Sequence, residues 1–162
     1  MHSGPVIIGF DGTRAAQHAL NETAPLLAAQ EVLVVVVWEA GRAFDLADLP
    51  SLTLDNPAAS LDLRAAFEAD RAAYEAALRL AEQGAQLATD AGLKAEGLAV
   101  ADELSVADTL VRLATEQDAR AVVVGGHGHN PLAELLLGHT AHEVLDKAPC
   151  PVVVVREHAE RG

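Results

Sequence analysis

Residues 119–155 decide the fold, and they read ARAVVVGGHGHNPLAELLLGHTAHEVLDKAPCPVVVV. The stretch opens with an apolar, β-branched run at residues 121–124, which leads into a glycine-rich turn at residues 125–128. A segment of helical period follows, and a second apolar run closes the stretch at residues 152–155. Continuous apolar runs of this length, bounded by Gly and Pro, are typical of strands that are covered on both faces. A strand that ends in glycines before a helix presents backbone N–H groups to an anion, so we expect a ligand site here.

The rest of the chain alternates in the same way between strand-like and helix-like segments. We expect strands at residues 6–10, 32–38 and 94–100, and helices at residues 14–30, 60–91 and 105–116. Pro25 should kink the first of these helices. Phe67 and Tyr74 mark the stripe of the long helix that is predicted to face the core, and Val106 is predicted to face inward in the next helix. The alternation predicts βαβ units and an α/β fold with a parallel sheet.

Two strand ends carry residues suited to a ligand, and we expect those two strands to be neighbours. The first strand is followed by Asp11 and Gly12, and the fourth by the glycine-rich turn. Open parallel sheets bind ligands beyond the carboxyl ends of their strands, where the strand order reverses. Residues 41–59 are acidic and proline-containing without a clear period, which predicts a long loop that serves as a lid, a binding loop or an insertion.

The composition excludes several classes of partner. The 162 residues are 51% hydrophobic and 22% charged, which is typical of one globular domain spanning residues 1–162. Lys and Arg total 11 against 24 Asp and Glu, so the net charge of −13 disfavours nucleic acid and anionic membrane surfaces. The single Cys150, the absence of a signal-peptide pattern and the shortness of the longest apolar run, residues 32–38, predict a cytoplasmic protein. Cys150 itself is predicted to be a buried small side chain rather than a reactive thiol.

Gly138 interrupts a segment that otherwise has the pattern of a helix over residues 132–147. A glycine in a helix interior costs about 1 kcal/mol relative to alanine. We therefore expect a break, with a second helix that starts near His139 or Thr140 and points its N–H donors at an anion. The alternative, a plain turn with a glycine required only for packing, is equally compatible with the spacing.

These residues resemble the universal stress proteins, whose signature is G-x2-G-x9-G-(S/T). Gly125, Gly128 and Gly138 fit that spacing without a gap. VIIGFDGT at residues 6–13 and APCPVVVV at residues 148–155 are similar to the family's first and last strands. The resemblance implies a Rossmann-like three-layer sandwich: a five-stranded parallel sheet in the order 3-2-1-4-5 with helices on both faces. It also implies a homodimer formed through the last strand, here Val152, Val153, Val154 and Val155.

One branch of the family binds ATP with little or no hydrolysis, and the resemblance implies a site for ATP, with Mg²⁺, or a related adenine nucleotide. By position, Asp11 and Val37 would contact the base, and the glycines would lie against the ribose and phosphates. The implied site residues are Asp11, Gly12, Val37, Gly125, Gly126, His127, Gly128, His129, Gly138, His139 and Thr140. The sequence departs from the family pattern at His139, which replaces the expected Ser or Thr, and at Ala141 and Glu134. These changes predict weaker phosphate binding than the glycines alone would give.

Four histidines lie close together in the sequence: His127, His129, His139 and His142. They are compatible with a metal site or with histidines on a polar surface. A third hypothesis is that His139 serves as a pH-sensitive cap for a phosphate. Asp11 is as well explained by a turn with Gly12 as by ligand binding. The competing functions are a stress protein that binds another protein instead of nucleotide, and a slow nucleotide hydrolase. Since no Walker or nucleophile-elbow motif is present, we expect a binding module rather than an enzyme.

Overall fold

The protein forms a five-stranded sheet in a computed structural model that describes residues 2–28, 30–42, 57–102, 104–126 and 138–156. The strands are β1 (Val6–Gly9), β2 (Glu31–Trp38), β3 (Lys94–Ala101), β4 (Ala121–Gly126) and β5 (Val152–Arg156). All pairings are parallel and the order is β3-β2-β1-β4-β5. The predicted strand order is confirmed, as is the expectation that β1 and β4 are neighbours.

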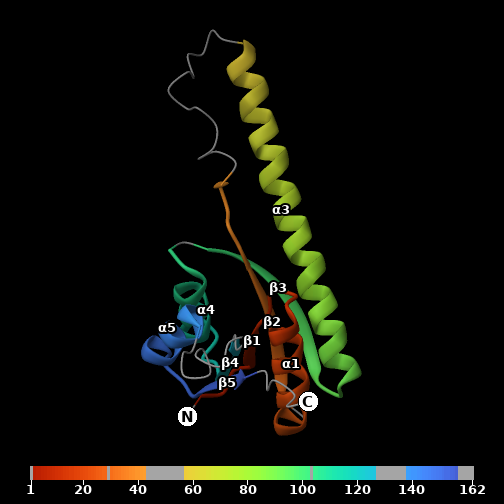
Figure 1. The fold of residues 1–162 in the computed structure, drawn as a ribbon, viewed down its shortest axis with the longest axis vertical. Helices are drawn as coiled ribbons and strands as arrows, with labels where there is room; N and C mark the ends of the chain where they lie inside the picture. Colours follow the sequence, from red (N-terminus) through yellow and green to blue (C-terminus); the bar gives the residue numbers. More distant parts are fainter. Residues whose placement is uncertain (1, 29, 43–56, 103, 127–137, 157–162) are drawn as a thin grey trace, which may run out of the picture.

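Helices cover both faces of this sheet. They are α1 (Arg14–Thr23), the 3₁₀ turn η1 (Ala24–Leu27), α3 (Pro57–Asp90), α4 (Val106–Glu116) and α5 (His139–Lys147). In Figure 1, α1 and α3 lie on one side of the strands, and α4 and α5 lie on the other. The predicted three-layer α/β sandwich is therefore confirmed.

The period of two along the strands divides the core into two layers. Ile8 and Val34 face α1 and α3, whereas their neighbours Ile7 and Val35 face α4 and α5, and all four side chains are almost fully buried. Successive side chains of a strand point to opposite faces, so only an uninterrupted apolar run can fill both layers. The β-branched runs of the sequence are explained by this double burial.

Two glycines bring α3 close to the sheet. A Cβ at Gly97 of β3 would lie 2.6 Å from the backbone carbonyl of Ala81, and a Cβ at Gly84 of α3 would lie 2.7 Å from Val34. The C-terminal half of α3 is thereby fixed against β2 and β3. Its N-terminal half projects well beyond the sheet (Figure 1).

Four details of the predicted elements are corrected. The first helix ends at Thr23, and the chain continues as η1 because Pro25 cannot donate a backbone hydrogen bond. Phe67 and Tyr74 are exposed, since the projecting half of α3 has no sheet beside it. Val106 is also exposed, at the first position of α4. Finally, residues 57–59 begin α3 rather than ending a loop, while residues 43–56 of that predicted loop lie outside the described residues.

Candidate functional site

A cavity of about 310 Å³ opens at the carboxyl ends of β1 and β4. Its walls are formed by Gly9, Phe10, Asp11, Thr13, Ala15, Ala16, Val35, Val37, Val106, Leu110, Val124, Gly125, Gly138, His139, Thr140 and Ala141. The chain leaves β1 toward β2 on one side and reaches β4 on the other, so this is the point where the strand order reverses. That point is the usual ligand site of an open parallel sheet, and the volume lies at the lower end of the range for small-molecule sites.

The cavity brings together most of the predicted site residues that the structure describes. Asp11, Val37, Gly125, His139 and Thr140 line it together with Gly138. Gly12 and Gly126 flank these residues along the chain and do not belong to the described lining. His127, Gly128 and His129 lie outside the described residues.

Asp11 closes the turn between β1 and α1. Its Oδ1 accepts hydrogen bonds from the backbone N–H of Thr13 (2.9 Å) and from Thr13 Oγ1 (2.6 Å). Gly12 follows with φ of +77°, a left-handed conformation that favours glycine. Thr13 Oγ1 in turn accepts from the backbone N–H of Ala16 (3.2 Å) and so caps α1. Asp11 therefore has its turn role, and the same turn holds it at the edge of the cavity.

Gly125 is required by close packing. A Cβ at this position would lie 2.9 Å from the backbone oxygen of Ala15, in the first turn of α1. Backbone atoms cannot rotate away as a side chain can, so any larger residue would displace the start of α1. The interpretation of this motif glycine as a packing residue is thus supported, and the tight approach also forms one wall of the cavity.

The helix start predicted near His139 is confirmed, whereas residues 132–137 of the predicted segment lie outside the described residues. α5 begins at His139, and Gly138 is its N-cap residue with φ of −54° and ψ of 151°. Glycine has no side chain that could accept from the first turn. The first hydrogen bond of the helix runs from His142 N to Gly138 O (3.0 Å). The backbone N–H groups of His139, Thr140 and Ala141 come before it, so they have no acceptor within the helix. The positive end of the helix dipole is therefore presented to the cavity that these residues line.

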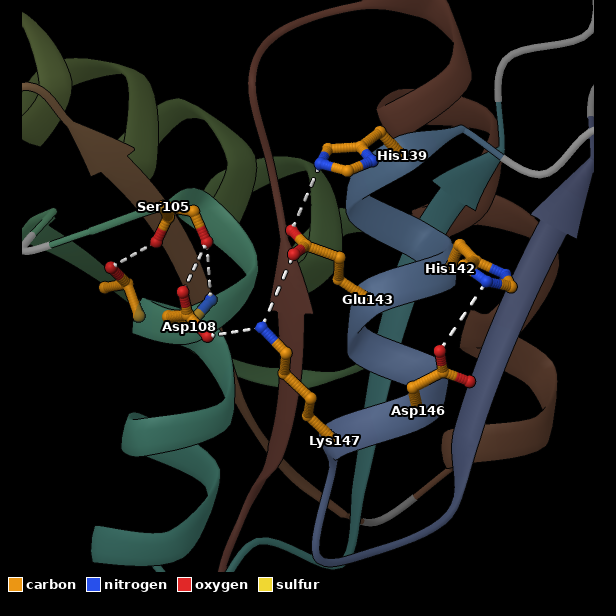
Figure 2. Close-up of polar contacts among 8 residues, drawn as sticks. Ser105, Asp108, His139, His142, Glu143, Asp146 and Lys147 are labelled. Atoms are coloured by element: carbon orange, nitrogen blue, oxygen red, sulfur yellow. Dashed lines mark hydrogen bonds and ion pairs between the residues drawn. The ribbon is translucent and has the colours of Figure 1, made fainter.

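An ion-pair network runs along α5 and across to α4 (Figure 2). His139 Nε2 lies 3.6 Å from Glu143 Oε2, and Glu143 Oε1 lies 3.4 Å from Lys147 Nζ. Lys147 Nζ also donates to Asp108 Oδ1 at 2.8 Å. Asp108 accepts a further hydrogen bond from Ser105 Oγ at 3.0 Å.

These contacts change the protonation of the partners in α4 and α5. The hydrogen bond from Lys147, followed by that from Ser105, holds the pKa of Asp108 below its usual value. The hydrogen bond to Asp108 raises the pKa of Lys147. Lys147 is therefore a cation committed to two carboxylates.

The remaining histidine of α5 lies on a different side of the helix from Glu143. His142 Nε2 lies 3.5 Å from Asp146 Oδ2, and Figure 2 shows this pair apart from the network. Within the part of the chain that the structure describes, His, Cys, Asp and Glu side chains form no group of three or more that could hold a metal ion. Cys150 is half-buried, and this burial raises the pKa of its thiol, which disfavours the reactive thiolate.

The apolar wall residues that were not among the predicted site residues include Val35, Val106 and Leu110. Val35 lies two positions before Val37 on β2, so the period of a strand places both side chains on the same face. Val106 and Leu110 lie four residues apart in α4 and face the cavity together. The signal was present in the sequence, because the helix after β3 must start at the same edge of the sheet as the glycine-rich turn.

The fold and the cavity define a class: an open parallel α/β protein whose cavity at the strand ends combines apolar walls with a helix N-terminus that has no side-chain cap among the described residues. A sequence model of the universal stress protein family matches residues 3–156, and the chain belongs to that family. Among characterised proteins it is similar to universal stress protein YxiE of Bacillus subtilis (strain 168), with 32% identity over 79 residues. That match covers 49% of this chain and 52% of YxiE, so the similarity spans about half the length of this relative.

Solved structures agree with the family assignment. The universal stress protein of Archaeoglobus fulgidus superimposes with a TM-score of 0.66 at 20% identity, over 94% of this chain and 98% of that one. A structure of an A. fulgidus universal stress protein in complex with dAMP gives a TM-score of 0.61 at 18% identity, over 96% and 99% of the two chains. At these identities the likeness establishes the fold.

Proposed function

We propose that this protein binds an adenine nucleotide, ATP with Mg²⁺ or a related compound, in the cavity at the ends of β1 and β4, and acts as a regulatory stress-response module. The observation that carries the proposal is the uncapped start of α5 beside an apolar slot. Structures of similar fold from this family are complexes with dAMP, cAMP and AMP, which supports the choice of an adenine nucleotide.

The apolar side of the cavity suits a purine ring. Val35 and Val37 of β2 line the cavity together with Val106 and Leu110 of α4, and these side chains would give a flat base an apolar surface to lie against. Asp11 lines the same cavity, and its carboxylate can accept a hydrogen bond from an exocyclic amino group. A carboxylate cannot donate to the carbonyl that guanine carries at the equivalent position, so this edge favours adenine.

The opposite end of the cavity suits a phosphate. Gly138, His139 and Thr140 line it at the N-terminus of α5, where backbone N–H groups and the helix dipole favour an anion. Gly125 lines the cavity between these two ends, beside the start of α1, where the ribose would lie. By the family signature, Gly126, His127, Gly128 and His129 would complete the phosphate-binding turn.

We place the protein among binding modules rather than hydrolases. Asp11 is the one carboxylate among the described lining residues, and its Oδ1 accepts two hydrogen bonds from Thr13, so it is held as a structural acceptor rather than as a base. Among the helices that the structure describes, none combines the length and apolarity needed to cross a bilayer. We further propose a cytoplasmic homodimer that pairs through residues 152–155, because β5 is an edge strand of the sheet.

Calorimetric titration of the nucleotide-stripped protein tests this function. ATP with Mg²⁺, AMP and cyclic AMP are titrated in turn, and saturable binding near one nucleotide per chain is expected. Val106→Trp fills the apolar slot from an exposed position and should weaken binding by about tenfold or more. Leu104→Trp is the matched control, because Leu104 is exposed and does not belong to the described lining.

Two outcomes would contradict the proposal. An absence of heat with every nucleotide would assign the protein to the branch of the family that acts through protein partners. Equal weakening by Val106→Trp and Leu104→Trp would mean that nucleotide binds elsewhere on the chain.

A further inference from the structure

The described residues that line the phosphate end of the cavity carry no permanent positive charge. Residues 121–146, which include the whole family signature, contain no Lys and no Arg. The described residues that line the cavity contain none either, and His139 is their one titratable base. An anion at this end must therefore be held mainly by backbone N–H groups and hydroxyls.

The cation that lies nearest along α5 is already neutralised. Lys147 Nζ is 2.8 Å from Asp108 and 3.4 Å from Glu143. Because one ammonium group contacts two carboxylates, the three side chains together keep a net negative charge. Figure 2 shows its side chain directed toward Asp108 and Glu143. Lys147 therefore does not act as a phosphate clamp in this arrangement.

Glu143 brings negative charge toward the start of α5. Its carboxylate lies 3.6 Å from Nε2 of His139, a residue that lines the cavity, and the Glu143 side chain is only 24% exposed. Asp146, one turn closer to the end of α5, pairs with His142 and has a side chain that is 68% exposed. The field of Glu143 is less screened by water than that of Asp146, since it is closer to the cavity and more buried.

We propose that this cavity selects nucleoside monophosphates over triphosphates in the absence of a metal ion, and that Glu143 is the residue that sets the preference. The inference rests on the proposed function and specifies its ligand class. The free N–H groups of α5 and the helix dipole, equivalent to about half an elementary charge, suffice for one phosphate. Each further phosphate adds negative charge near Glu143, and the described lining residues include no Lys or Arg to balance it. Mg²⁺ would supply that balance, so ATP binds well only as its metal complex.

Titration calorimetry at pH 8 in EDTA tests the selectivity directly, with adenosine, AMP, ADP and ATP as ligands. AMP should bind at least about tenfold more tightly than ATP, with ADP between them. Added Mg²⁺ should reduce the ratio of the AMP affinity to the ATP affinity. Glu143→Gln should reduce this affinity ratio by about threefold or more in EDTA, which is the order expected for one partly screened charge near the phosphates.

Asp146→Asn supplies the matched control, because it removes the same charge from the same helix at the exposed position. The ratio of AMP affinity to ATP affinity in this variant should equal that of the unaltered protein. Equal or tighter binding of ATP than of AMP in EDTA would overturn the inference, and so would an identical change of the ratio in Glu143→Gln and Asp146→Asn. A failure of the proposed function has a different signature, since adenosine and AMP would then not bind at all.

Discussion

The starts of α1 and α4 differ from the start of α5. Thr13 Oγ1 accepts from the third residue of α1 and Ser105 Oγ accepts from Asp108 N in α4, so both helices cap themselves with a side chain. α5 begins after Gly138, which has no side-chain acceptor. A Ser, Thr or Asp at that position would stabilise the helix by about a few tenths of a kcal/mol. The contrast indicates that α5 leaves its first N–H groups available to a ligand at the expense of its own stability.

The packing around the N-termini of α1 and α5 also differs, since it is tight at α1 and open at α5. Gly125 lets the first turn of α1 approach β4 to backbone contact, whereas no described atom lies within 4 Å of a Cβ placed at Gly138. The first and last glycines of the family signature are thus used differently. Gly125 fixes a capped helix in place, and Gly138 leaves an uncapped helix open.

The largest effect is expected from substitutions that separate these two glycines. Gly125→Val should destabilise the fold by about 2 kcal/mol or more, because its Cβ would overlap the Ala15 carbonyl. Gly138→Val, the matched control, should change stability by a few tenths of a kcal/mol, since its backbone is extended and its surroundings are open. Urea unfolding with an unchanged m-value provides the measurement. Equal midpoints for the two variants would refute the assignment of Gly125 to packing.

A second variant converts the open start of α5 into a capped one. Gly138→Asp should raise the free energy of unfolding by about 0.5–1 kcal/mol, because the new carboxylate accepts from the first turn and complements the helix dipole. The same carboxylate should weaken AMP binding by about tenfold, since it occupies the donors and repels the phosphate. Gly138→Ala has no acceptor and should leave AMP binding within about twofold. Undiminished binding by Gly138→Asp would show that the N-terminus of α5 does not hold the phosphate.

The smallest effect concerns the self-capped start of α4, and it depends on pH. The pKa of Asp108 is lowered in the folded protein, chiefly by Lys147, so the folded state favours the charged form. This contribution is complete above the unfolded pKa of about 3.9 and is lost as the pH falls through the lower folded pKa. Asp108→Asn should therefore flatten the loss of stability with acid below about pH 4. Asp146→Asn, whose partner is His142, is the comparison variant; if both variants retain the slope of the unaltered protein, the Lys147 contact does not persist in solution.

The sequence predicts the sheet well because its signals are local. The runs at 6–10 and 32–38 are apolar and largely buried on both faces, whereas the β-branched run at 152–155 is half-buried at the edge of the sheet. The helix start at His139 follows from the cost of glycine in a helix interior. The residues at the ends of β1 and β4 are predictable for the same reason, since parallel strands bring their carboxyl ends to one edge.

The burial and the contacts of other side chains depend on distant elements, which the hydrophobic period of one helix does not identify. Phe67 and Tyr74 lie on an apolar stripe, yet the stripe extends past the end of the sheet, and Tyr74 contacts Trp38 with ring centroids 5.7 Å apart. The sharing of Lys147 between Glu143 and Asp108 joins the last turn of α5 to the first turn of α4, since Lys147 and Asp108 are 39 residues apart, and no spacing rule predicts it. Helical period gives the face of a helix, whereas the tertiary fold decides what covers that face.

The 34 residues of α3 also affect how the protein moves through solution. At 1.5 Å per residue this helix is about 50 Å long, and its N-terminal half extends from the body of the molecule (Figure 1). Such an extension raises the frictional coefficient, so even a single chain diffuses and elutes as a larger sphere would. An early gel-filtration peak would therefore mimic a dimer, whereas mass from light scattering is independent of shape. The same rod makes rotational diffusion anisotropic, which gives slow tumbling about the axes perpendicular to α3.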